Sequence, residues 1–231
     1  QAAEIDPALT AGFVAVAAGD GVQQLFRDLG VQQIVSGGQT MNPSTEDILH
    51  AAEQVPAMDV YVLPNNKNIV MAAEQAARLA RTSGVRRIHV VPTTTIPQGI
   101  SAMMAYDESA EIKDNVEAMQ EAAEHVQSGS VTFAARDSDY DGHQIKEGEL
   151  LALENGKVAF TGTDLGSVTA KVAKDLMQED SQFITLLYGE GVTEEQAADV
   201  EEAVRSLLPE EVELTVAYGG QPVYYFLISV E

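Results

Sequence analysis

Uncharged hydrogen-bonding side chains gather in three short segments of this sequence, each directly after a run of apolar residues. The segments are 36–44, 64–68 and 92–97. Such side chains recognise ligands or partners through amide and hydroxyl groups, and paired glycines let another backbone approach closely. The residues that we expect to contribute to binding are Gly37, Gly38, Gln39, Thr40, Asn42, Asn65, Asn66, Lys67, Asn68, Thr93, Thr94 and Thr95.

Part of this polarity has a simpler structural explanation. Ser44, Asn66 and one of the threonines are typical helix caps or turn residues. Capping does not require three adjacent threonines, however, and Lys67 is the only cation in the set. Because the set contains no acid, base, metal ligand or nucleophile, we expect this site to bind and not to catalyse.

Other classes of chemistry lack their characteristic motifs. The sequence has neither a phosphate-binding G-x-x-x-x-G-K-[ST] loop nor a dinucleotide-binding G-x-G-x-x-G motif. In two other glycine pairs an acid, Asp20 or Glu190, lies between the glycines, where it would repel phosphate. A nucleophile elbow of the form G-x-S-x-G is also absent. We therefore expect no autonomous binding of ATP or NAD and no catalytic residues.

The sequence gives little support for a metal site. It has no cysteine, and its four histidines are dispersed. Residues 137–142 match the opening of a calcium loop, but Gly148 stands where the twelfth-position glutamate is required. Strands, not helices, are expected on both sides. We interpret this segment as an acidic solvated turn and expect no metal.

The net charge restricts the kind of partner. There are 36 acidic and 13 basic residues, giving −23 at pH 7. DNA, RNA and anionic membranes require clustered Lys and Arg, so we expect none of them as partners. The acidity favours solubility or a salt-adapted cytosol, and steering of a basic protein partner is the alternative. No apolar run approaches the length of a transmembrane helix.

The elements that must position these residues indicate a two-lobed α/β fold. Residues 1–10 resemble an internal linker. In lobe 1, residues 11–128, four apolar runs alternate with helical spacing, which predicts a parallel sheet covered by helices on both faces. The loops after such strands meet at one edge, where ligands bind. Lobe 2, residues 129–231, is predicted as a mixed α/β lobe with a hairpin at Asn155-Gly156, and residues 128–130 are expected as the boundary. The predicted helices are 44–54, 67–81, 97–106, 109–127, 165–178 and 193–207.

Four motifs in order resemble a known family: S-G-G-Q-T-M-N-P-S, L-P-N-N-K-N-I, H-V-V-P-T-T-T-I-P-Q-G and G-G-Q-P-V-Y-Y-F-L-I-S-V-E. They are similar to the C-terminal region of the large, ATP-using subunit of bacterial two-component fatty acid kinases, also called dihydroxyacetone-kinase-like or DAK phosphatase-like. The resemblance extends from about residue 11 to Glu231. It implies a fold like that of DegV proteins and of the K domain of dihydroxyacetone kinase.

The resemblance also implies a function on a partner. In this family a separate DegV-type protein carries a fatty acid, and the kinase converts its carboxylate to an acyl phosphate for phospholipid synthesis. ATP and Mg²⁺ belong to an N-terminal domain whose aspartates have no counterpart here, so this fragment itself is expected to be non-catalytic and cofactor-free. We expect it to dock the carrier in the cytoplasm, and a homodimer of the full-length subunit is a further expectation. The alternative is a domain that itself binds a lipid or a dihydroxyacetone-type ligand.

Overall fold

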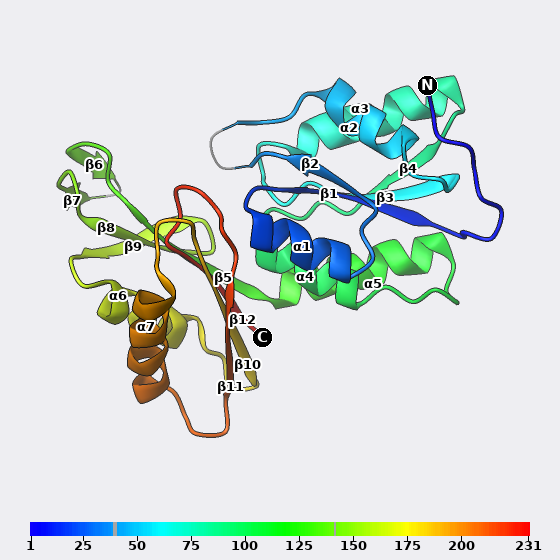
Figure 1. The fold of residues 1–231 in the computed structure, drawn as a ribbon. Helices are drawn as coiled ribbons and strands as arrows, with labels where there is room; N and C mark the ends of the chain where they lie inside the picture. The colour runs from blue at the N-terminus through cyan, green and yellow to red at the C-terminus, as the bar shows by residue number, and fades with distance from the viewer. Residues whose placement is uncertain (39–40, 141) are drawn as a thin grey trace. The chain divides into compact units, whose positions relative to one another are not determined.

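The computed structural model describes residues 1–38, 41–140 and 142–231. The chain forms two compact units (Figure 1). Unit 1 comprises residues 1–18 and 23–125, and unit 2 comprises residues 19–22 and 126–231. The expected division fell after residue 128, whereas unit 2 resumes at Val126. Residues 19–22, directly after the first strand, belong to unit 2, although the helix that begins at Asp20 continues to Asp28 in unit 1.

Unit 1 contains the parallel sheet that the apolar runs predict. Its strands have the order β2-β1-β3-β4, and all three neighbouring pairs are parallel. In Figure 1, α2 and α3 cover one face, and α4 and α5 lie on the other. The strands are β1 (Gly12–Ala17), β2 (Gln33–Ser36), β3 (Asp59–Leu63) and β4 (Arg87–Val90), and the helices are α1 (Asp20–Asp28), α2 (Thr45–Glu53), α3 (Val70–Ser83), α4 (Ile96–Met104) and α5 (Ile112–His125).

Local sequence explains where several of these helices begin and end. The Ser44 hydroxyl accepts from the Asp47 N–H while the Asp47 carboxylate accepts from the Ser44 N–H, a capping box at the start of α2. Thr95 caps α4 through its hydroxyl, which accepts from the Gln98 N–H. Gly84 ends α3 in the left-handed conformation, with φ 71°.

One helix start differs from the sequence-based expectation. We expected a helix over 67–81 capped by Asn66, but α3 starts at Val70, and Ile69 precedes it without a side-chain cap. The Asn66 amide nitrogen donates to the Gly38 carbonyl. Asn66 Oδ1 also accepts from the Asn68 N–H at 2.8 Å. Asn66 therefore joins two loops and caps the turn that leads into α3, although the helix itself starts later than expected.

Unit 2 is the predicted mixed α/β lobe. Its six-stranded sheet has the order β11-β10-β12-β5-β8-β9. The β10–β11 pair is parallel, and the other four pairs are antiparallel. Both helices lie on one face of the sheet (Figure 1). The elements are β5 (Gln127–Phe133), β6 (Ser138–Tyr140), β7 (His143–Ile145), β8 (Leu150–Glu154), β9 (Lys157–Gly162), α6 (Leu165–Leu176), β10 (Phe183–Tyr188), α7 (Glu194–Leu207), β11 (Glu213–Tyr218) and β12 (Phe226–Val230).

In two segments of unit 2 the secondary structure differs from the sequence-based expectation. Residues 128–130, expected as a boundary loop, lie inside β5. A Cβ atom on Gly129 would come within 2.5 Å of Val172 Cγ1, so glycine lets α6 pack directly against this strand. The segment interpreted as an acidic turn is a short hairpin, β6 paired with β7, and its residue Asp141 lies outside the described residues.

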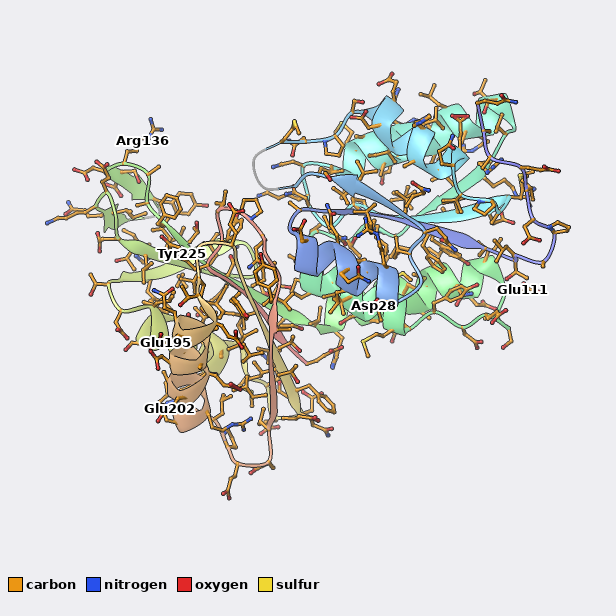
Figure 2. The ribbon with its side chains drawn as sticks, viewed as in Figure 1. Asp28, Glu111, Arg136, Glu195, Glu202 and Tyr225 are labelled. Carbon is orange, nitrogen blue, oxygen red and sulfur yellow. The ribbon has the colours of Figure 1, made fainter. Side chains whose placement is uncertain are left out.

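Each unit has its own hydrophobic core. In unit 1, α2 and α3 pack on valines of β1 and β3 such as Val14 and Val62. In unit 2, α6 and α7 pack on the even-numbered positions of β10 and β12, for example Ile184 and Ile228. Acidic side chains such as Glu195 and Glu202 mark the outer side of α7 (Figure 2). In the part of the chain that the structure describes, no helix is long and apolar enough to span a bilayer.

Candidate functional site

The loops after β2, β3 and β4 are joined by hydrogen bonds at one edge of the unit 1 sheet. Asn66 Nδ2 donates to the Gly38 carbonyl at 2.6 Å, which connects the loops after β3 and β2. Asn65 Nδ2 donates to the carbonyl of Val16, near the end of β1, at 3.0 Å. Asn65 also bonds to Thr93, in the loop after β4. The loops after β2, β3 and β4 therefore converge at this edge, as expected.

Asn65 and Thr93 form the buried centre of this arrangement. The Asn65 N–H donates to Thr93 Oγ1 at 3.1 Å, and the Thr93 hydroxyl donates to Asn65 Oδ1 at 2.8 Å. The two residues are only 6% and 1% exposed. Asn65 also has φ 57°, in the left-handed region that asparagine tolerates better than most residues. Both side chains hold the loops together and offer little surface to a partner.

Helix α4 supports Asn65 from one side. A Cβ atom placed on Gly99 would lie 2.1 Å from Asn65 Oδ1 and 2.7 Å from its Cγ. The missing side chain of Gly99 thus creates the space that the Asn65 amide occupies. This contact couples the first turn of α4 to the loop after β3.

Other predicted residues of this edge face solvent. Asn42, Lys67, Asn68 and Thr94 are exposed. The Thr94 N–H and hydroxyl both donate to Gln98 Oε1, at 2.7 and 3.0 Å, so this loop is also fixed to α4. These exposed groups are the part of the predicted set that a partner can reach.

The remaining predicted residues have varied roles. Gly37 and Gly38 have φ 153° and 109°, and Gly38 supplies the carbonyl that Asn66 binds. Thr95 is half-buried and caps α4. Gln39 and Thr40 lie outside the described residues.

Two exposed methionines of unit 1 were missed by the sequence reasoning. Met41, in the loop before α2, is 67% exposed, and Met71, in the first turn of α3, is 76% exposed. Both belong to segments at the carboxyl edge of the sheet, where α2 and α3 begin. Because methionine is flexible and polarisable, exposed methionines are common on protein-binding surfaces. Met41 follows β2 and Met71 follows β3 in the sequence, and these positions could have suggested that both lie at the carboxyl edge of the sheet.

A second missed feature is a charged cluster across β3 and β4. Asp59 accepts from Arg87 Nε and Nη2 at 2.8 and 2.9 Å, and His89 Nε2 lies 2.9 Å from Asp59 Oδ1. The hydrogen bonds from Arg87 hold the pKa of the Asp59 carboxyl below its usual value, although burial opposes this shift. The cluster lies at the first residues of both strands, so it stands apart from the loop edge. It stabilises the β3–β4 pair.

The loop edge is suited to recognition of another molecule. Its internal hydrogen bonds fix the backbone in advance, and its exposed groups are amides, a hydroxyl, one ammonium group and two thioethers. Preorganisation lowers the entropy that binding must offset.

Comparison with known proteins identifies a matching family and a matching fold. The family model for the FakA-like C-terminal domain of fatty acid kinase matches residues 12–231. An uncharacterized protein of Staphylococcus haemolyticus is 43% identical over 218 residues, which cover 94% of this chain and 39% of that protein. The chain therefore spans well under half the length of this relative.

Solved structures with the same fold are more distant in sequence. A DegV family protein from Ruminococcus gnavus, solved with vaccenic acid, has a TM-score of 0.66 and 12% identity, over 96% of this chain and 99% of that chain. The dihydroxyacetone kinase from C. freundii, solved with AMP-PNP and Mg²⁺, has a TM-score of 0.68 and 14% identity. That match covers 98% of this chain and 49% of the kinase chain. At these identities the likeness establishes the fold, which agrees with the DegV-like and dihydroxyacetone-kinase-like expectation.

Proposed function

Since the chain belongs to the family of FakA-like C-terminal domains of fatty acid kinase, we propose that it docks a separate DegV-type fatty-acid carrier. Docking would present the carboxylate of the carried fatty acid to the nucleotide-binding domain of the same kinase polypeptide. Phosphorylation to the acyl phosphate takes place in that other domain, with its ATP and Mg²⁺. This domain supplies recognition.

The observation that carries the proposal is the preorganised edge formed by the loops after β2, β3 and β4. Asn65 and Thr93 fix these loops from within, so the outward groups of Lys67, Asn68 and Thr94 are held in place. Met41 and Met71 add exposed apolar area in the same loop region. A surface of neutral polar groups and flexible apolar side chains suits a protein partner better than a phosphate or a nucleic acid.

The proposal is tested by measuring affinity for the fatty-acid-loaded carrier with calorimetry. In the test variant, Asn68→Ala is combined with Thr94→Ala, because both side chains are exposed and neither lies in the core. We expect at least a tenfold loss of affinity, equivalent to about 1.4 kcal/mol, with an unchanged far-UV circular dichroism spectrum.

A matched control places the same kind of change elsewhere on unit 1. Gln75→Ala combined with Thr82→Ala removes an exposed amide and an exposed hydroxyl from the middle and the carboxyl end of α3. This control should bind the carrier as the unchanged protein does. If the test variant keeps full affinity, or if both variants lose it equally, the loop edge is not the docking surface.

The lipid-binding alternative makes a different prediction for the purified domain. The DegV family protein of R. gnavus was solved with vaccenic acid, and a domain of the same fold that held an acyl chain would retain it through purification. Native mass spectrometry would then show a mass increase that unfolding removes. Such an adduct, together with full carrier affinity of the test variant, would favour ligand binding over docking.

A further inference from the structure

A cavity of about 450 Å³ lies in unit 1 beside the α4–α5 connection. Its wall includes Thr10 and Ala11, just before β1, and Tyr61, in the middle of β3. The rest of the wall comes from the segment between α4 and α5 and from the first turn of α5. Figure 2 labels Glu111 at this connection, just before α5 begins. The loop edge instead follows the carboxyl ends of the strands, so the cavity is a separate site.

Aromatic rings make up one side of the cavity. Tyr61 and Tyr106 both line it, with ring centroids 5.6 Å apart and planes inclined at 68°. Phe13 stacks on Tyr61 at 5.2 Å and meets Tyr106 edge-on at 4.8 Å. Tyr61 is only 1% exposed and Tyr106 is half-buried. Phe13 and Tyr61 therefore hold the Tyr106 ring in place, and Tyr106 is the aromatic surface that a ligand can reach. A cation within about 6 Å of such a ring is attracted by its quadrupole.

The polar groups of the cavity favour positive charge in the ligand. Glu108 and Glu111 both line it, and both are exposed. Lys113 is the only basic residue among the described residues that line the cavity, and it too is exposed. The carboxylates therefore outnumber the cation by two to one at this site.

The buried amide of Asn115, which lines the cavity, already has hydrogen-bond partners and offers little to an anion. Asn115 is 2% exposed. Its Nδ2 donates to the Asp107 carbonyl at 2.8 Å, and its Oδ1 accepts from the Asp107 N–H at 2.9 Å. The side chain also lies beside the Tyr61 hydroxyl. Because Asn115 is committed to holding the α4–α5 connection, it is not a free donor for a bound anion.

From this combination we infer that the cavity binds a small organic cation: an ammonium or guanidinium group on a short apolar stem. The Tyr106 ring contacts the apolar part and the charge, and Glu108 and Glu111 neutralise the charge at the opening. Glu108, Glu111 and Lys113 also line the cavity, and covering three charged side chains with an acyl chain is unfavourable. The cation is either a free amine or the side chain of a lysine or arginine, and the cavity would recognise both through the same contacts.

Choline and 3,3-dimethylbutan-1-ol provide a direct test, because they have the same shape and only choline is charged. The complete chain is titrated with each, and the amide NMR signals of residues 106–115 are followed. We expect choline to bind in the millimolar range and the neutral alcohol to bind at least fivefold more weakly. Equal binding of the two, or no shifted signals with either, would overturn the inference. Blocked arginine and lysine amides form a second arm: tighter binding of these than of choline assigns the cation to a protein side chain.

Variants separate the contribution of the rings from that of the charges. Tyr106→Leu should weaken choline binding about fivefold, whereas Tyr106→Phe keeps the ring and should bind normally. The pair Glu108→Gln and Glu111→Gln, both at exposed positions, should also weaken binding and reduce its salt dependence. Lys113→Ala should strengthen binding by about twofold. Weaker binding by Lys113→Ala would show that the cavity prefers an anion and would refute the proposal even if Tyr106→Leu fails to fold.

Discussion

Replacing Gly99 with alanine should destabilise unit 1, although the same change in a helix is normally favourable. In a helix interior, alanine is favoured over glycine by about 1 kcal/mol. Here the new Cβ would lie 2.1 Å from Asn65 Oδ1 and 2.7 Å from Asn65 Cγ. The amide of Asn65 must move, because these distances are far below van der Waals contact.

The expected cost follows from what Asn65 would lose. Overpacking alone costs about 1–3 kcal/mol. Displacement also breaks the bonds of Asn65 to the Val16 carbonyl and to the Thr93 hydroxyl, and each buried group left unpaired costs about 1–3 kcal/mol. Partial relaxation avoids some of these losses. After the helical gain is subtracted, we expect Gly99→Ala to lower the free energy of unfolding by about 2 kcal/mol.

A double-mutant cycle with Asn65→Gly makes the reasoning falsifiable. Glycine tolerates the φ of 57° at this position and removes the amide that Gly99→Ala would strike. In that background Gly99→Ala should become stabilising by up to about 1 kcal/mol. The coupling energy is then about 3 kcal/mol, which is large for a single contact.

Urea denaturation monitored by hydrogen exchange of unit 1 peptides measures this cycle, because it reports on one unit of a two-unit chain. The expected signature is a reversal in the sign of the Gly99→Ala effect between the two backgrounds. A stabilising effect of Gly99→Ala in both backgrounds would show that the Asn65 amide does not occupy the space beside α4. The contact between Gly99 and Asn65 would then not couple α4 to the loop edge.

Three further changes have definite expected outcomes. Arg86→Ala should destabilise unit 1 by about 3 kcal/mol in urea unfolding, because this 2%-exposed residue donates to four backbone carbonyls, of which, among the described residues, only that of Glu53 keeps another bond, from the Ala3 N–H. Burial and the neighbouring Asp175 raise the pKa of Glu154 to about 7. The unfolded chain therefore loses this proton first, and stability falls as the pH rises from 4.5 to 7. Solvent screening limits this loss to roughly 1 kcal/mol, and Glu154→Gln should remove it when urea midpoints at pH 5 and 8 are compared. Val223→Gly should stabilise unit 2 by about 1 kcal/mol in thermal unfolding, because a β-branched residue at φ 71° is strained.

Much of the fold could be predicted because its signals are local. Short apolar runs followed by polar loops indicated β1 to β4, and their alternation with helical spacing indicated the parallel order of the sheet. The capping boxes at Ser44 and Thr193 are local signals of the same kind, since both partners lie within one helical turn. The hairpin at Asn155-Gly156 is likewise set by two neighbouring residues with positive φ.

Features that depend on tertiary contacts could not be predicted. Residues 128–130 have the composition of a loop, but their place is decided by the close packing of Gly129 against α6. The Asp59–Arg87–His89 cluster depends on the β3–β4 register, which joins residues 28 or more positions apart. For the candidate site, residue type indicated which side chains are polar but not which of them are buried and which face solvent. Asn65 and Asn68 look alike in sequence, and only the first is buried.

The sheet order of unit 2 has a consequence for how this chain reaches its native state. Strand β12 lies between β10 and β5, which are separated by about fifty residues, and it pairs with both. Until β12 has been synthesised, β10–β11 and β5–β8–β9 each have an unpaired edge at which another chain could add. Unit 2 therefore passes through an aggregation-prone interval during translation that unit 1, whose four strands pair within the first ninety residues, largely avoids.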